Sequence, residues 1–241
     1  MINSLSIIFP IYNEEKRIHF TFKDIKKFNL KNSYIKLEYI FVDDGSEDNV
    51  VNLIRNFTNE NKLKNVNYKI IKLPTNQGKG FAIKQGIKFA KNQWILTIDA
   101  DISVSLIQIK DWIKKKYLNE KYDIYFGSRN LKNSKVDTKV YRKLLGHIFS
   151  SILKLLFAIK FKDTQCGFKL YKRVVAKKIF SNVYDKGFVH DVEVALISKK
   201  LNYQIKELPV KWTHKNDSKL NLLVDTLKMF IKLLFIKIKK S

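Results

Sequence analysis

The stretch Trp94-Ile-Leu-Thr-Ile98-Asp99-Ala-Asp101 joins a short apolar run to two aspartates that stand two positions apart. The run contains no turn former and is rich in aliphatic side chains, which predicts a buried strand. Parallel α/β sheets bind ligands where their strands end, which is where Asp99 and Asp101 stand. Because strand side chains alternate, both carboxylates are expected to face the same way and to share Mg²⁺ or Mn²⁺ with a phosphate ligand. The alternative is a pair of solvated loop acids.

The composition favours one large α/β domain, or such a domain with an appendage, because 45% of the 241 residues are hydrophobic. The formal net charge is +25, from 47 Lys+Arg against 22 Asp+Glu, so the candidate partners are nucleic acid, a membrane surface and a phosphorylated substrate. Lysine is abundant throughout, and part of the excess is assigned to ordinary solvated surface. The single cysteine, Cys166, excludes an internal disulfide and fits a reducing cytoplasm.

No uncharged apolar run reaches the roughly 18 residues of a spanning helix. The longest uncharged run, residues 1–13, contains Pro10 and lacks the basic start and the small-residue cleavage site of a signal peptide. The chain is therefore expected to remain in the cytoplasm, or to lie on a membrane without crossing it.

Four strand-turn-helix units follow one another in the first half of the chain. Strands are expected at residues 5–9, 37–42, 68–73 and 95–98. Helices are expected at residues 14–28, from a cap at Ser46 to residue 58, from the 76–80 turn to residue 91, and at 107–118. A further strand is expected at residues 124–126. This alternation predicts a parallel sheet with right-handed crossovers.

Each of the four strands ends in a polar cluster, and a parallel sheet places all four on one edge. The clusters are Tyr12 with Glu14, Asp43 with Asp44, Gly78 to Gly80, and Asp99 with Asp101. Their convergence predicts a nucleotide site. The Gly78-Lys79-Gly80 turn has neither the Gly-x-x-x-x-Gly-Lys-Ser/Thr nor the Gly-x-Gly-x-x-Gly spacing, so ATP hydrolysis and dinucleotide redox chemistry lose support.

Two segments are basic and amphipathic. Residues 139–162 hold six Lys/Arg and no acid, with apolar residues spaced as on one helix or a pair of helices. In residues 219–241 the apolar side chains share a helical face opposite Lys228, Lys232 and Lys239. Either segment has an alternative as an ordinary helix packed on the core. Because both are basic, an anionic membrane surface is the favoured partner.

Short motifs cover nearly the whole chain. They are Pro10-Ile-Tyr-Asn-Glu14, Val42-Asp-Asp-Gly-Ser46, Asn76-Gln-Gly-Lys-Gly80, Asp99-Ala-Asp101, Gly127-Ser-Arg129, Asp163-Thr-Gln-Cys-Gly-Phe-Lys169, Asp191-Val-Glu193, and Pro209 to Trp212 with Ser218-Lys219. Together they resemble the inverting family-2 glycosyltransferases, and most closely the polyprenyl-phosphate (dolichyl-phosphate) β-glucosyltransferases. The first five are shared by many sugar transferases. The segment from Asp163 to Lys169, and Trp212 followed by Ser218-Lys219, are more typical of the lipid-phosphate branch.

The resemblance implies a mostly parallel, nucleotide-sugar-binding sheet of the GT-A, Rossmann-like type. It implies a transferase domain of residues 1–218, which includes the basic segment 139–162, and an appended basic helix of residues 219–241. The implied activity is a metal-dependent, inverting transfer of glucose from UDP-glucose to a polyprenyl (dolichyl or undecaprenyl) phosphate.

The resemblance also implies a role for each matching position. The donor side comprises Pro10, Tyr12, Glu14, Asp43 and Asp44 for base and ribose, and Gly78 and Lys79. Asp99 would hold ribose or diphosphate, and Asp101 would hold the metal. Arg129 would hold the acceptor phosphate, while Gln165 and Lys169 would line the place where donor and acceptor meet.

Three positions depart from the family pattern. Ser103 stands where mannose-transferring relatives often carry a Gln that assists the metal, which weakens the case for a mannose donor. His190 precedes Asp191-Val-Glu193 where an aromatic residue is usual, and Asn216-Asp217 replaces a Gly before Ser218. These two changes leave the acceptor side less well defined.

The expected chemistry depends on the acceptor. Breaking the bond between the anomeric carbon and the diphosphate leaves negative charge, which a metal on Asp101 and a nearby Lys would stabilise. A polyprenyl monophosphate, with a second pKa of about 6, is largely dianionic at pH 7 and needs little general base. A sugar hydroxyl needs one, and Asp191 and Glu193 are the available carboxylates. Alternatively they bind glucose hydroxyls, or Asp191 caps a helix and Glu193 is an exposed helix acid.

Other functions remain as alternatives. A polyprenyl-phosphate mannosyltransferase using GDP-mannose and a transferase to a glycan hydroxyl share the donor site, but the latter has no use for two basic amphipathic segments. A nucleic-acid-binding protein would use the +25 charge, but no familiar binding motif appears, so no nucleic acid is expected. Trp212 lies either in the core or near the acceptor, and Cys166 is expected to be a packed thiol. The oligomeric state stays open.

Overall fold

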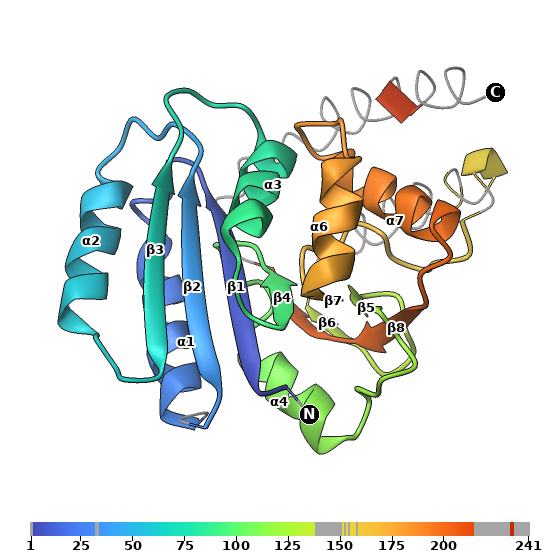
Figure 1. The fold of residues 1–241 in the computed structure, drawn as a ribbon, viewed down its shortest axis with the longest axis horizontal. Coiled ribbons are helices and arrows are strands. Elements are labelled where there is room, and N and C mark those ends of the chain that lie inside the picture. Colours follow the sequence, from blue (N-terminus) through green and yellow to red (C-terminus); the bar gives the residue numbers. More distant parts are fainter. Residues whose placement is uncertain are drawn as a thin grey trace.

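A computed structural model describes residues 2–31, 34–137, 151, 153, 155–157, 159–214 and 232–233 (Figure 1). In chain order its strands and helices are β1 (Ser4–Ile11), α1 (Ile18–Lys31), β2 (Lys36–Asp43), α2 (Val50–Glu60), β3 (Val66–Lys72), α3 (Lys79–Phe89), β4 (Trp94–Thr97), α4 (Ile107–Lys114), β5 (Ile124–Ser128), β6 (Lys135–Asp137), β7 (Lys169–Lys172), α6 (Arg173–Ser181), α7 (His190–Lys200), β8 (Ile205–Pro209) and β9 (Lys211–Thr213). The predicted alternation of strands and helices is confirmed.

The main sheet has seven strands in the order β3-β2-β1-β4-β7-β5-β8. All neighbouring pairs are parallel except the two that involve β7, which runs antiparallel to β4 and β5. The expectation of a mostly parallel sheet is therefore confirmed, and β7 is the exception that the sequence pattern did not reveal. Because β5 has the same direction as β4, the carboxyl ends of β1, β2, β4 and β5 lie on one edge. Strands β6 and β9 form a separate two-stranded sheet.

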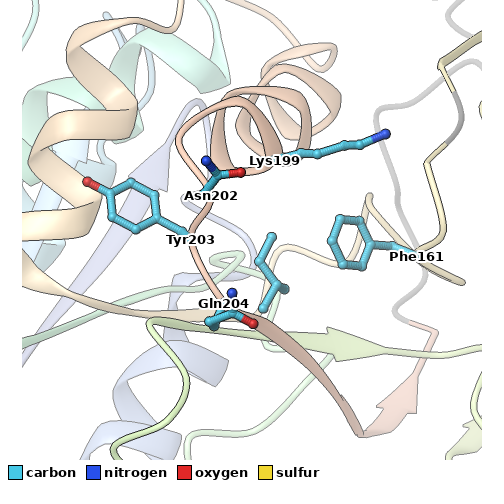
Figure 2. A pocket seen from close by; sticks show the side chains of 6 residues that line it. Phe161, Lys199, Asn202, Tyr203 and Gln204 are labelled. Carbon is cyan, nitrogen blue, oxygen red and sulfur yellow. The ribbon is translucent and has the colours of Figure 1, made fainter.

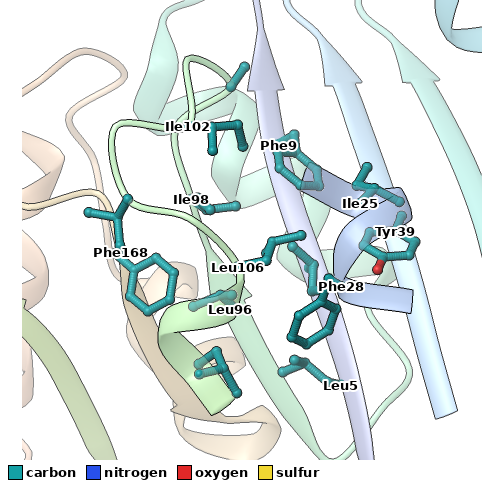
Figure 3. Close-up of a cluster of buried hydrophobic side chains, with 14 of the residues drawn as sticks. Leu5, Phe9, Ile25, Phe28, Tyr39, Leu96, Ile98, Ile102, Leu106 and Phe168 are labelled. Carbon is teal, nitrogen blue, oxygen red and sulfur yellow. The ribbon is translucent and has the colours of Figure 1, made fainter. Parts of the chain in front are cut away.

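Apolar side chains cover both faces of the main sheet, which explains why its strands are apolar without alternation. One core cluster contains Leu5 and Phe9 of β1 together with residues of α1, α2 and α4. Figure 3 shows Ile25 and Phe28 of α1 on the same side of the sheet as Phe9 and Leu5 of β1, with the Phe28 ring next to Leu5. The other cluster contains Ile8 of β1 together with residues of α3, α6 and α7. Burial of each large apolar side chain contributes about 1.5–3 kcal/mol, so both layers stabilise the edge that carries the site.

Two helices start later than expected, and α4 ends at Lys114 rather than at residue 118. Helix α1 starts at Ile18 rather than near residue 14, and α2 starts at Val50 rather than after a cap at Ser46. The Ser46 hydroxyl instead accepts a hydrogen bond from the backbone N–H of Asn13 at 2.8 Å. The backbone of the neighbouring loop thus binds the hydroxyl that was expected to cap α2.

The two basic segments lie largely outside the described residues, which do not include 138–150, 215–231 and 234–241. Within the first segment, Leu153 and Ile159 are buried in the core, and Leu155 is 84% exposed. Within the second, Leu233 is buried in the cluster that contains α3, α6 and α7. In the part of the chain that the structure describes, no helix has the length and apolar character to cross a bilayer.

Candidate active site at the carboxyl edge of the sheet

The loops that follow β1 and β2 are clasped to each other. The Asn13 side-chain oxygen accepts the backbone N–H of Glu47 at 2.8 Å, and Asp48 accepts the N–H of Glu15 at 2.9 Å. This clasp fixes Tyr12, which is 38% exposed, on the rim of the site. Glu14, also expected on the donor side, forms a two-point ion pair with Arg17, with atom separations of 2.5 and 2.8 Å.

Asp43 and Asp44 at the end of β2 have different environments. The Asp44 carboxylate accepts the backbone N–H groups of Gln77 and Gly78 at 2.8 and 2.7 Å, and burial raises its pKa. Asp43 is fully buried, and its Oδ1 accepts the N–H of Ser46 at 3.1 Å. Its Oδ2 has no hydrogen-bond partner among the described residues. An unsatisfied buried acceptor is costly, so Asp43 fits a ligand that brings an N–H or O–H donor.

Three backbone amides of the turn into α3 already have partners within the protein. The N–H groups of Gln77 and Gly78 are bound by Asp44, and the N–H of Phe81 donates to the Lys186 carbonyl at 3.1 Å. Gly78 has φ +103°, and a Cβ added there would lie 2.4 Å from the Lys186 oxygen. The glycines therefore serve close packing of the α6–α7 loop, and the charged group of this turn is Lys79.

Lys79 and the two aspartates of the opening stretch come together beyond the end of β4. The Lys79 ammonium lies 2.6 Å from Asp99 Oδ1. Asp99 and Asp101 follow the strand in a turn rather than extending it, and Asp101 accepts the backbone N–H of Ser103 at 2.9 Å. Burial and the charge of Asp99 raise the pKa of Asp101. Burial alone would lower the pKa of Lys79, but Asp99 and other acids outweigh it and raise that pKa.

The donor set for a metal is two carboxylates. The described residues contain no group of three or more His, Cys, Asp or Glu side chains that could hold an ion. Mg²⁺ and similar ions commonly use one or two carboxylates together with substrate phosphates and water. Burial is the main cause of the raised pKa of Asp101 and the charge of Asp99 adds to it, so a bound cation would stabilise this carboxylate. Asp99 and Asp101 therefore fit a divalent cation that completes its shell with phosphate oxygens.

Lys169 and Asp191 form an almost fully buried ion pair between β7 and α7, with side chains 1% and 8% exposed. The Lys169 ammonium also donates to the Cys166 carbonyl at 2.8 Å. Burial alone would raise the pKa of Asp191, but His190, Lys169 and Lys79 outweigh it and lower that pKa to about 2. In this structure both residues lie beneath the site rather than on its open surface.

Glu193 is buried, contrary to the alternative of an exposed helix acid. Its Oε2 accepts the backbone N–H groups of Tyr184 and Asp185 at 2.9 and 2.7 Å, so it holds the loop before α7. Asp185 binds the amides at the start of α7, because its Oδ1 accepts the N–H groups of Val189 and His190 at 3.1 and 3.2 Å. The alternative in which Asp191 caps this helix is therefore wrong, because Asp191 lies inside its first turn.

Arg129, at the end of β5, is held by a residue that the motif analysis did not single out for this role. Its Nε and Nη2 donate to Asp163 at 2.7 and 2.9 Å, and its guanidinium carbon lies 6.0 Å from the Trp212 ring centre. Asp163 also accepts the N–H of half-buried Gln165 at 3.1 Å. Cys166 is buried, and burial raises its pKa to about 12, as expected of a packed thiol.

A separate cavity of about 230 Å³ lies where α7 ends and β8 begins (Figure 2). It is lined by Phe161, Lys199, Asn202, Tyr203, Gln204 and Ile205. None of the residues expected to bind substrate lines this cavity. The structure instead brings Lys79, Asp99, Asp101, Asp191 and Arg129 into electrostatic contact at the carboxyl edge of the sheet.

Comparison with known proteins gives consistent results. Residues 6–180 match the sequence profile described as Glycosyl transferase family 2. A dolichyl-phosphate beta-glucosyltransferase of Dictyostelium discoideum is 33% identical over 240 residues, covering 93% of this chain and 71% of the relative. The Saccharomyces cerevisiae and Homo sapiens proteins of the same name are each 32% identical over 247 residues. They cover 97% and 98% of this chain, and 74% and 75% of their own lengths.

Solved structures show the same fold at lower identity. Glucosyl-3-phosphoglycerate synthase from Mycobacterium tuberculosis, in complex with Mg²⁺ and UDP, has a TM-score of 0.66 and 16% identity, covering 98% of this chain and 79% of that one. The mannosyltransferase PcManGT from Pyrobaculum calidifontis, in complex with GDP-Man and Mn²⁺, has a TM-score of 0.63 and 14% identity, covering 98% and 64%. The expected GT-A fold is therefore confirmed.

Proposed function

Because this chain belongs to glycosyl transferase family 2, we propose that it transfers glucose from UDP-glucose to a polyprenyl phosphate with inversion at the anomeric carbon. The relatives with about one third identity are named dolichyl-phosphate beta-glucosyltransferases, which supports both the sugar and the acceptor class. The observation that carries the proposal is the pairing of Lys79 with Asp99 beside Asp101, at the ligand-binding edge of the sheet.

The nucleotide end of the donor lies at the rim formed by the loops after β1 and β2. Asp43 Oδ2 is a buried acceptor without a partner in the described structure, and a uracil N–H or a ribose hydroxyl would satisfy it. Pro10 and Tyr12 form the wall next to it. The carboxylates of Glu14 and Asp44 already bind Arg17 and the backbone of the 77–78 turn. We therefore assign these two residues to supporting the rim rather than to contacting the nucleotide.

The diphosphate lies beyond the end of β4. Asp99 and Asp101 would hold Mg²⁺ or Mn²⁺, which would supply positive charge to stabilise the departing UDP. Lys79 donates hydrogen bonds to the diphosphate, and its raised pKa keeps its ammonium charged. One displacement then forms the bond between the acceptor phosphate oxygen and the anomeric carbon while the bond to UDP breaks.

The acceptor phosphate lies near Arg129, on the far side of β4 from the nucleotide rim. Asp163 occupies Nε and Nη2 of the guanidinium and so fixes its orientation. A phosphate needs little help from a base because it is largely dianionic at pH 7, its second pKa being about 6. Asp191, with a pKa of about 2 and a buried ion pair, is a weak base, so we assign it and Lys169 to shaping the floor of the site.

The lipid acceptor also accounts for the charge of the chain. Polyprenyl phosphates lie in membranes with the phosphate at headgroup level, and the +25 net charge favours an anionic surface. We therefore place the protein at the cytoplasmic face of a membrane, associated peripherally.

The test is incubation of the full chain with Mg²⁺, radiolabelled UDP-glucose and a polyprenyl phosphate, followed by organic extraction. We expect extractable label that requires the lipid, and much less label from GDP-mannose. GDP-mannose used at least as well as UDP-glucose would reassign the enzyme as a mannosyltransferase. A parallel incubation contains a soluble glycan in place of the lipid, and label that appears only there would favour a hydroxyl acceptor.

A further inference from the structure

The loop from Val183 to His190, between α6 and α7, crosses the N-terminus of α3 at the upper edge of Figure 1. Two backbone carbonyl groups of this loop accept hydrogen bonds from α3. The Lys186 carbonyl accepts the N–H of Phe81 at 3.1 Å, and the Val183 carbonyl accepts the Lys84 ammonium at 2.8 Å. The loop is therefore fixed against the helix that carries Lys79.

Buried carboxylates fix the loop from the other side. Glu193 accepts the N–H groups of Tyr184 and Asp185, and Asp185 in turn accepts that of Gly187 at 2.8 Å. The His190 ring nitrogen Nδ1 lies 2.6 Å from the Gly187 carbonyl, which makes Nδ1 the donor. A segment with this many backbone hydrogen bonds presents its side chains in defined directions.

Two aromatic side chains of this loop are exposed, and only one of them is near the site. Tyr184 is 83% exposed, and Phe188 is 38% exposed. The Phe188 ring centre lies 6.0 Å from the Lys79 ammonium, which itself lies 2.6 Å from Asp99. An aromatic ring held partly open to solvent beside the diphosphate position is a surface for whatever group the diphosphate carries.

The order of the strands indicates which group that is. The proposed function places the nucleoside at the ends of β1 and β2 and the diphosphate at the end of β4, which is the next strand in the sheet. Phe188 is presented by the α6–α7 connection two residues before α7 begins, and Asp191 in the first turn of α7 pairs with Lys169 of β7. A donor stretched across this edge places its hexose, rather than its base, on the β7 side.

We propose that Phe188 packs against the hexose ring of the bound nucleotide sugar and so positions the anomeric carbon for attack. The inference rests on the proposed function. The C–H groups on a pyranose face are weakly positive, and the face of an aromatic ring is negative, so the two surfaces attract. The ring also covers the hexose from water and disfavours hydrolysis of the donor.

The test compares binding of UDP-glucose with binding of UDP, each with Mg²⁺, by calorimetry on the full chain. Phe188→Ala is expected to weaken UDP-glucose binding about fivefold and to leave UDP binding unchanged, because UDP lacks the hexose. Phe188→Tyr keeps a ring and is expected to bind both like wild type. Tyr184→Ala is the matched control, an exposed aromatic removed from the same loop.

The outcomes separate this inference from the proposed function. If Phe188→Ala binds UDP-glucose like wild type, or loses UDP and UDP-glucose equally, Phe188 does not contact the hexose. A wild-type protein that binds neither ligand overturns the donor assignment and this inference with it. Selective loss of UDP-glucose in Phe188→Ala, with both ligands retained in Tyr184→Ala, supports the inference even if the acceptor proves to be different.

Discussion

Lys169 of β7 and Asp191 of α7 form an ion pair that is almost completely removed from solvent. The pair joins the one antiparallel strand of the sheet to the helix that follows the Phe188 loop. Through α7, the pair fixes the position of the α6–α7 loop, which packs on α3, relative to β7.

Removal of one partner should be much more damaging than loss of a half-exposed pair. Lys169→Met leaves the buried Asp191 carboxylate unpaired and is expected to lower the free energy of unfolding by about 3–5 kcal/mol. Lys172→Met, on the same strand, breaks a pair with Asp123 whose side chains are 35% and 24% exposed, and should cost no more than about 1 kcal/mol. Urea unfolding of both variants measures the difference. Equal losses of stability would show that the buried Lys169–Asp191 pair contributes no more than the partly exposed Lys172–Asp123 pair.

Stability should also fall in acid, with a sign that follows from two lowered pKa values. The pKa of Asp191 falls from its usual 3.8 to about 2, and Arg129 holds the pKa of buried Asp163 below its usual value. A carboxyl with a lower pKa in the folded state stabilises the fold above its unfolded pKa. That contribution, about 2 kcal/mol for Asp191, is lost as pH falls from about 4 through 2. Thermal unfolding between pH 6 and 2 should show this decline, and Asp191→Asn should make it smaller, leaving the part due to Asp163.

Metal binding should depend on Asp101 and on pH. Because the pKa of Asp101 is raised, protons compete with the metal over a higher pH range than for an ordinary aspartate. We expect Mn²⁺ affinity, measured by titration in the presence of UDP, to rise with pH and to be lost in Asp101→Asn. EDTA should abolish transfer. Asp111→Asn, which removes a surface acid paired with Lys211, is the control and should behave like wild type. Full activity in EDTA would contradict a role for metal.

Because α3 packs closely against the α6–α7 loop, an alanine at Gly80 of α3 should have a larger effect than an alanine at Gly187 of the loop. A Cβ at Gly80 would lie 2.7 Å from both the Asp185 carbonyl oxygen and His190 Cβ, so Gly80→Ala must displace the loop. We expect a loss of about 1–3 kcal/mol in stability, with weaker binding of UDP-glucose. At Gly187 the nearest atoms would lie 3.5 and 3.7 Å away, so Gly187→Ala should change stability by less than about 0.5 kcal/mol. Similar unfolding curves for the two variants would show that the contact at Gly80 is loose.

Local patterns predicted the first half of the fold well. Strands β1 to β4 are short apolar runs bounded by turn residues, and their carboxyl ends carry the acids that the site uses. Strand β7 was missed because Lys169-Leu-Tyr-Lys172 has charged ends and little length, and only its place between β4 and β5 makes it a strand.

The motifs indicated candidate site positions but not the partners that hold them. Arg129 meets Asp163 34 residues later, and Lys169 meets Asp191 22 residues later, so no local spacing indicates either pair. The same reason explains the wrong cap at Ser46, whose hydroxyl is taken by Asn13 from 33 residues away. No sequence pattern indicated a role for Phe188, because its proximity to Lys79 depends on how the α6–α7 loop packs on α3.

The C-terminal segment was expected to be an appended membrane-binding helix. The alternative, a helix packed on the core, can be tested at Leu233. Leu233 is fully buried in the cluster of α3, α6 and α7, and the neighbouring Lys232 lies 2.9 Å from Asp185. If the segment belongs to the domain, Leu233→Ala should cost about 2–4 kcal/mol of stability through the cavity it leaves.

Leu155, 84% exposed in the other basic segment, is the matched control, and Leu155→Ala should leave stability nearly unchanged. Sedimentation with anionic liposomes provides the second measurement, because an exposed leucine that enters the interface contributes to binding without stabilising the fold. We expect Leu155→Ala to weaken liposome binding, wild-type binding to weaken with salt, and Leu233→Ala to act on unfolding instead. If Leu233→Ala unfolds like wild type and sediments poorly, the segment is a membrane anchor rather than part of the core.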